Sequence, residues 1–133
     1  LFTTGDLLTQ IDVPPLAADT GFGHIKQRMK SESFSMATAS ARVTLNARRV
    51  DACRVALGAC IPFPTRLPSL ETALAGKFCD DRDALIKMIE DAAGTLTFLS
   101  KEGMSRDYIH HLAMVTLADA IQQAAREAEG RHA

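Results

Sequence analysis

The hydrophobic pattern of this sequence changes its period near the middle of the chain, and this change constrains the fold more than any other feature. Before Pro62, apolar and polar residues alternate, as they do in half-buried β-strands. After Pro68, apolar residues recur every three or four positions, as they do in amphipathic helices. Strands followed by helices are typical of an α+β domain. We therefore predict a small antiparallel β-sheet of three to four strands with a helical bundle packed on one face, in a single domain spanning residues 1–133.

The alternating part of the sequence predicts the strands. The first strand should stop at the prolines Pro14 and Pro15, which cannot extend a ladder. The start of the third strand, in the stretch SMATASARVTLN, is ambiguous, because its small and β-branched residues could form a helical turn before the chain extends. The letters NARR predict a hairpin between the last two strands. We expect the strands to end near Val13, Gln27, Leu45 and Leu57.

The second part of the sequence predicts three helices, at residues 69–75, 81–93 and 105–128. The first would begin at a capping serine, Ser69, and end before a glycine. The second has acidic residues in its first turn and a glycine at its end. The third repeats apolar residues at helical spacing along one buried stripe. A chain of 133 residues with 47% hydrophobic content can bury one core.

Basic residues are concentrated in one segment, although the net charge is only −1. Residues 20–66 hold eight basic side chains and two acidic ones. Such a segment can be a nucleic-acid surface, a site for an anionic cofactor, a face docked on an acidic partner or a solvated surface. Few aromatic residues interrupt it, whereas base stacking needs several. We therefore expect no nucleic-acid partner.

Several kinds of chemistry lack their usual sequence patterns. The three cysteines, Cys53, Cys60 and Cys79, form no C-x-x-C pair, and we interpret them as core thiols. The histidines do not have metal-ligand spacing, and no G-x-G-x-x-G, P-loop or G-x-S-x-G motif occurs. No apolar run reaches about 18 residues. We therefore predict no catalytic residue, no metal site and no membrane span, and we expect a cytoplasmic protein.

Four motifs, in order, resemble a known family. Together they cover nearly the whole chain, and each is degenerate by itself. The motifs are GDLLTQIDVPP, HIKQRMKSESFSMATASARVTL, CRVALGACIPFPTRLPSLETALAGK and MSRDYIHHLAMVTLADAI. With them the chain resembles the C-terminal domain of the FAD-binding (medium) subunit of molybdenum hydroxylases, which include carbon monoxide dehydrogenase and xanthine dehydrogenase. Ala59 stands where this family often has a second glycine after Gly58.

The resemblance implies a part in an oxidoreductase rather than catalysis by the isolated domain. FAD in the complete subunit would collect electrons from iron–sulfur clusters and pass them to an external acceptor. Molybdenum cofactor and iron–sulfur clusters would belong to partner subunits. The glycine-rich turns that hold the FAD phosphates belong to upstream domains in this family, so this chain should bind FAD weakly or not at all. The alternative is a non-catalytic interaction or structural module that keeps the fold without flavin.

The resemblance also assigns roles to a few residues. The family lysine that matches Lys26 lies beside the isoalloxazine ring of the flavin, where a fixed positive charge favours the reduced form. Lys26 is therefore the expected cofactor-binding residue. Arg28 and Lys30 would add electrostatic support from further away, or would be surface charges. Arg66 and Glu71 are expected to brace the turn into the helices.

Overall fold

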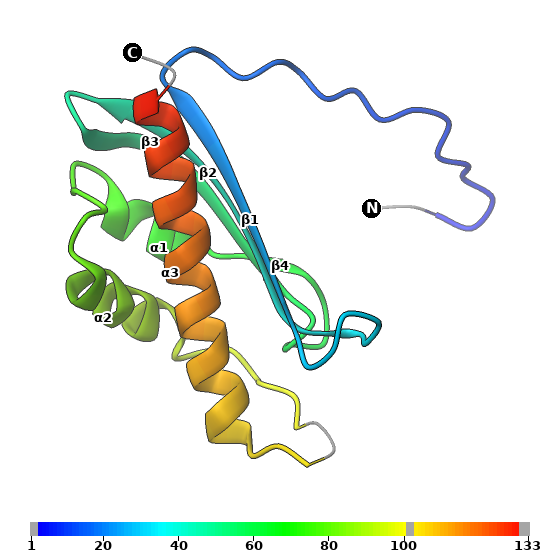
Figure 1. Cartoon of the computed structure of the whole chain (residues 1–133). Helices are drawn as coiled ribbons and strands as arrows, with labels where there is room; N and C mark the ends of the chain where they lie inside the picture. The colour runs from blue at the N-terminus through cyan, green and yellow to red at the C-terminus, as the bar shows by residue number, and fades with distance from the viewer. Residues whose placement is uncertain (1–2, 101–102, 131–133) are drawn as a thin grey trace.

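A computed structural model describes residues 3–100 and 103–130, which form an antiparallel sheet covered on one face by helices (Figure 1). The strands follow chain order β1-β2-β3-β4 across the sheet, so each neighbouring pair is antiparallel. The predicted α+β class is confirmed. The strands are β1 Thr20–Arg28, β2 Ser35–Asn46, β3 Arg49–Gly58 and β4 Thr65–Arg66, and the helices are α1 Pro68–Leu74, α2 Arg82–Ala93 and α3 Arg106–Gly130.

The long helix α3 lies directly against β1 and β2, and small residues on both sides make this possible. Gly21 and Gly23 of β1 present no side chain to the helix, and the backbone of α3 occupies the space where their Cβ atoms would be. Alanines on α3 reduce its thickness on the same side. The fully buried alanines of α3 are Ala113, Ala118, Ala120, Ala124 and Ala128. The close approach follows from these small residues.

The core lies between the sheet and the helices. Alternate residues of β2 and β3 point into it, among them Val43, Val55 and Leu57, each no more than 1% exposed. Leu85 and Ile89 of α2 face the same core. All three cysteines are buried, which agrees with their interpretation as core thiols.

The helix boundaries agree with the prediction to within a residue or two, but the start of α1 has another cause than expected. Helix α1 begins at Pro68, its N-cap is Leu67, and no side chain caps it. The predicted cap at Ser69 is therefore wrong, because proline at the first helical position already fixes the backbone for a helix. Helix α2 does have a side-chain cap: Asp81 accepts hydrogen bonds from the amides of Asp83 and Ala84, at 3.1 and 3.0 Å.

The hairpin between β2 and β3 lies at the predicted place. Asn46 pairs with Arg49, and the two residues between them, Ala47 and Arg48, have positive φ of 48° and 64°. This left-handed backbone suits a tight hairpin turn, although glycine and asparagine usually supply it. The open question about residues 35–40 is also answered, because β2 is extended from its first residue.

The prediction of a first strand ending at Val13 is wrong for the described chain. The segment before β1 is an extended trace in Figure 1, and its residues 7–13 pair with no strand of the described sheet. Their alternation predicts a half-buried strand, yet none of the described residues offers them a ladder partner. The sheet begins instead at Thr20.

Candidate functional site

The face of the sheet opposite the helices, which we call the open face, carries the sequence-predicted site. In β1, Gly21 and Gly23 face α3, so the alternate residues point the other way. Across the open face, the ring nitrogen Nδ1 of His24 lies 2.8 Å from the hydroxyl of Ser40 in β2. The residues that β1 contributes to the open face are Phe22, His24, Lys26 and Arg28.

Lys26 is exposed on the open face, near the end of β1, and pairs in register with Thr38 of β2. Among the described residues, the Lys26 ammonium has no hydrogen bond and no ion pair. Its charge is therefore available to a group outside the described part of the chain. The role expected of Lys26 beside a flavin stays a prediction.

Arg28 and Lys30 differ in what they contribute to this end of the sheet. The Nη1 atom of Arg28 donates to the carbonyl oxygen of Ser31 at 2.6 Å, so this guanidinium holds the loop between β1 and β2. Lys30 lies in that loop, where its carbonyl accepts hydrogen bonds from the amide and hydroxyl of Ser33, at 3.1 and 2.9 Å. Both basic side chains are exposed. Arg28 therefore also braces this loop, and the electrostatic support expected of Arg28 and Lys30 stays a prediction.

Exposed apolar side chains lie at the same end of the sheet as Lys26. The loop from β1 to β2 carries Met29 and Phe34, and Phe34 is 98% exposed. The loop from β3 to β4 carries Phe63, which is 78% exposed. Because Thr38 pairs with both Lys26 and Gly58, the two loops leave the sheet at one end. We call this the Lys26 end. Its apolar side chains are functional candidates that the sequence analysis did not identify.

Arginines form a second group on the open face. Arg42 of β2 lies directly opposite Arg54 of β3, and Arg66 of β4 lies one strand further on. Together with Phe22 and Ser40 they line a cavity of about 210 Å³. Arg42 has no ion pair among the described residues.

Glu71 of α1 neutralises part of this positive charge and braces the fold. Its carboxylate accepts from Nε and Nη2 of Arg66 at 2.7 and 2.5 Å, and from the amide of Val55 at 3.0 Å. Arg54 approaches the same group at 3.6 Å. The hydrogen bonds from Arg66 hold the pKa of the buried Glu71 carboxyl below its usual value. The expected bracing role of Arg66 and Glu71 is confirmed, because one carboxylate ties α1 to β3 and β4.

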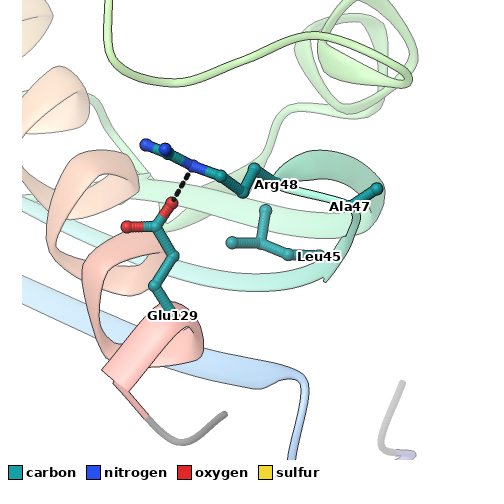
Figure 2. Close-up of a pocket in the computed structure, with 4 residues that line it drawn as sticks. All are labelled: Leu45, Ala47, Arg48 and Glu129. Carbon is teal, nitrogen blue, oxygen red and sulfur yellow. Dashed lines mark hydrogen bonds and ion pairs between the residues drawn. The ribbon is translucent and has the colours of Figure 1, made fainter. Parts of the chain in front are cut away.

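A larger cavity, of about 550 Å³, lies at the opposite end of the sheet beside the hairpin turn (Figure 2). It is lined by Leu45, Ala47, Arg48 and Glu129. Arg48 donates to Glu129 at 3.1 Å and lies 3.4 Å from Asp80. These contacts join the hairpin, the loop before α2 and the end of α3. The Arg48 guanidinium is thus already paired. Thr20 of β1 pairs with Thr44 beside this cavity, and Lys26 is six residues further along β1, or roughly 20 Å away.

Two buried thiols, Cys53 and Cys79, and the possible metal ligands of the described residues bear on the chemistry open to the domain. Burial raises the pKa of both Cys53 and Cys79 to about 11, so these thiols are protonated and poor nucleophiles at neutral pH. Within residues 3–100 and 103–130, no group of three or more potential metal ligands comes together. In the same ranges, no helix is long and apolar enough to cross a membrane.

The fold and the site define an α+β domain with an open, basic sheet face and with cationic and apolar side chains at one end. The model of the CO dehydrogenase flavoprotein C-terminal domain matches residues 24–124. The chain belongs to this family, as its motifs predicted. No curated protein matches the chain.

Solved structures show the same fold in longer chains. Carbon monoxide dehydrogenase from Hydrogenophaga pseudoflava is 25% identical, with a TM-score of 0.76 over 86% of this chain and 40% of the other. Quinoline 2-oxidoreductase from Pseudomonas putida 86 is 24% identical, with a TM-score of 0.75 over 82% and 38%. Reconstituted CO dehydrogenase from Oligotropha carboxidovorans is 22% identical, with a TM-score of 0.76 over 88% and 40%. This chain thus spans about two fifths of the length of these relatives.

Proposed function

We propose that this chain is the C-terminal domain of the FAD-containing subunit of a molybdenum hydroxylase, and that its Lys26 end forms one wall of the flavin site. The observation that carries the proposal is the exposed Lys26 ammonium, unpaired within residues 3–100 and 103–130, at the end of the sheet where Met29, Phe34 and Phe63 are also exposed. The family match and the relatives named above support it. The flavin, when bound, supplies a centre that takes up and releases electrons.

The residues present fit one side of a flavin ring and not the whole cofactor. A lysine ammonium attracts an electron-rich ring, and apolar side chains beside it keep water away. Tight binding of the diphosphate needs backbone amides such as those of a glycine-rich turn at a helix N-terminus, and this sequence has no glycine-rich motif of that kind. We therefore assign the phosphate contacts to upstream FAD-binding domains of a longer polypeptide.

The remaining parts of the proposal concern partners. Iron–sulfur and molybdopterin subunits would deliver electrons from substrate to the flavin, and an external acceptor would remove them, as the resemblance implies. We place the complex in the cytoplasm. The open face, with its paired and unpaired arginines, leaves room for a contact with these subunits.

The test of the site is the midpoint potential of the flavin in the complete subunit carrying Lys26→Met. Methionine keeps most of the stem and removes the charge, which should destabilise the reduced flavin by about 1 kcal/mol. That energy lowers the potential by about 20 mV for a two-electron couple. The matched control is Lys77→Met, because Lys77 is also exposed but lies near the opposite end of the sheet, where its carbonyl accepts from Val50. Equal potentials in both variants, with flavin fully bound, would make Lys26 a plain surface charge.

A second measurement tests the division between this domain and the upstream ones. FAD titrated against the 133-residue chain should bind weakly or not at all, because one ammonium and a few apolar contacts cannot replace the phosphate-binding turns. A dissociation constant below about 1 µM corresponds to more than about 8 kcal/mol of binding free energy and would contradict this division.

A further inference from the structure

Three arginines on the open face, Arg42, Arg54 and Arg66, carry more positive charge than the chain neutralises. We call them the arginine group. In the described part of the chain, the only carboxylate within ion-pair distance of these guanidiniums is that of Glu71, 2.5 Å from Arg66 and 3.6 Å from Arg54. Three cations against one anion leave an excess of two positive charges. Arg42 has no ion pair in the same residues, so the excess is greatest there.

The position of Arg42 is unfavourable for the isolated fold. Arg42 and Arg54 are register partners on neighbouring strands, and like charges directly opposite each other destabilise a sheet. The register partner of Arg42 on its other side is Phe22, which carries no charge. An exposed residue that costs stability and makes no polar contact within the fold is typical of a binding surface.

The shape of this region suits a side chain of another protein better than a free small molecule. The cavity beside the arginine group has a volume of about 210 Å³, and Phe22 and Ala56 supply apolar parts of its lining. Pockets that bury most of a small ligand are larger, about 300 Å³ or more. The side chains of Arg54 and Arg66 are 54% and 52% exposed. Arginine and phenylalanine are also residue types that are enriched at protein interfaces.

The chemistry and spacing of the arginine group favour carboxylates. A guanidinium presents a planar fork of N–H donors that matches a carboxylate. Side chains directly opposite each other, as at Arg42 and Arg54, start about 5 Å apart, and diagonal ones, as at Arg54 and Arg66, about 7–8 Å apart. Acidic residues two apart in an extended segment are about 6.6 Å apart. A segment with alternating acidic residues can therefore reach two guanidiniums at once.

Two other occupants fit this face less well. A second copy of the chain, placed by two-fold symmetry, would bring one arginine group against the other, and the like charges would repel. Single-stranded nucleic acid binds by stacking its bases on several aromatic side chains, whereas Phe22 is the only aromatic residue that lines this cavity among the described residues.

We propose that the arginine group is the centre of a docking surface for a separate protein, which binds through an acidic segment whose carboxylates pair with Arg42 and Arg54. A separate protein is favoured because permanent interfaces are more apolar than this face, and half-exposed charges instead steer reversible association. The surface lies four residues along β1 from Lys26, or roughly 13 Å, as the pairing of Phe22 with Arg42 shows. The inference goes beyond the flavin role and does not depend on it.

The first test titrates an acetylated octapeptide of alternating glutamate and serine into the 133-residue chain by calorimetry. At about 20 mM salt, where charges are weakly screened, we expect saturable binding with a dissociation constant below about 1 mM. The same peptide with glutamine in place of glutamate should not bind. Absence of saturable binding by the acidic peptide would overturn the proposal, as would equal binding of the two peptides.

A pair of variants tests whether the arginine group carries this binding. Arg42→Gln should weaken it by about fivefold or more, because a charged hydrogen-bond partner is lost. Arg126→Gln is the matched control, since Arg126 is also exposed but lies on α3, in the other layer, and it should change the affinity by less than about twofold. Equal weakening in both variants would reduce the effect to net charge and overturn the proposal.

Other ligands test the identity of the occupant. Glutarate that bound as tightly as the peptide would make the cavity a small-molecule site, and an oligothymidine that bound more tightly than the peptide would make the face a nucleic-acid surface. Self-association of the chain in analytical ultracentrifugation that Arg42→Gln abolished would make the occupant a second copy. Each of these three results would overturn the proposal.

Stability separates a binding role of Arg42 from a structural one. Arg42→Gln removes one of two like charges that face each other, so its urea midpoint should equal or exceed that of the wild type. A lower midpoint would make Arg42 part of the fold and would overturn the argument from its unpaired charge. All of these measurements use the chain without flavin, so their outcome is independent of the test of Lys26.

Discussion

Substituting alanine for Gly23 should destabilise the domain through one contact between β1 and α3. A Cβ atom at position 23 would overlap the carbonyl oxygen of Ala120 and would lie 2.9 Å from the amide nitrogen of Ala124. Both groups belong to the helix backbone, so no change of rotamer can move them. The only relief is a displacement of α3 away from the sheet.

The size of the effect follows from how much packing that displacement costs. To restore van der Waals distance, α3 must move by roughly 1 Å, and a gap of that size forfeits up to about half of each contact energy. The residues affected are fully buried, among them Leu117 and Ile121. Overpacking costs about 1–3 kcal/mol, and backbone clashes belong at the upper end. Alanine also lowers the conformational entropy of the unfolded chain, which offsets about 0.5–1 kcal/mol of this loss in stability. We therefore expect Gly23→Ala to lower the free energy of unfolding by about 2 kcal/mol.

Urea unfolding of the 133-residue chain, followed by far-ultraviolet circular dichroism, measures this loss as a lower midpoint at constant m-value. Gly94→Ala is the matched control. Gly94 has a φ of −57°, and its added Cβ would come no nearer than 3.7 Å to another group, so this variant should be as stable as the wild type or slightly more stable. If Gly23→Ala stayed within about 0.5 kcal/mol of the wild type, the glycine would not be what sets the helix position.

Other side chains give shorter predictions. Glu71→Gln should lower the free energy of unfolding by about 1–2 kcal/mol near pH 7. This value already allows for the partial exposure of Arg66, which weakens the ion pair. The folded-state pKa of Glu71 is lowered, so the difference in unfolding free energy between the variant and the wild type should be fully present above about pH 5. It should vanish as the pH falls and the carboxyl takes up its proton, and urea unfolding at a series of pH values measures it. Iodoacetamide at pH 8 should alkylate Cys53 and Cys79 only in urea, since burial raises the pKa of each to about 11; fast native labelling would contradict this. Ala59→Gly should stabilise the fold by up to about 1 kcal/mol, because residue 59 has a φ of 67°; lower stability would show that its methyl group packs usefully.

The helices could be predicted well because their signals are local. Helix α2, for example, has its capping aspartate, Asp81, and its apolar spacing within the same short stretch of sequence. The strands depend on partners far along the chain. The start of β2 was ambiguous because Ala37 and Ala39 have little preference of their own, and contact with α3 decides their conformation. Residues 7–13 show the same dependence, since alternation describes a strand but does not supply its neighbour.

The site was predictable in part, for a related reason. The residue type and the strand of Lys26 could be inferred from sequence, and its role beside a flavin stays a prediction. The exposure of Phe34 could not be inferred, because it depends on the path of a loop that Arg28 holds through the Ser31 carbonyl.

The glycines of the stretch TGFGH carry information about the site that the sequence analysis missed. Glycines are typical of turns, yet Gly21 and Gly23 lie inside a strand, where their missing side chains admit the backbone of α3. Because side chains alternate across a strand, fixing Gly21 and Gly23 toward the helix fixes Lys26 toward the open face. A shift of one residue in the register of β1 would turn the Lys26 ammonium under α3, where an unpaired charge is costly. The residues that let the helix approach one face of the sheet therefore also orient the candidate flavin-binding lysine on the other.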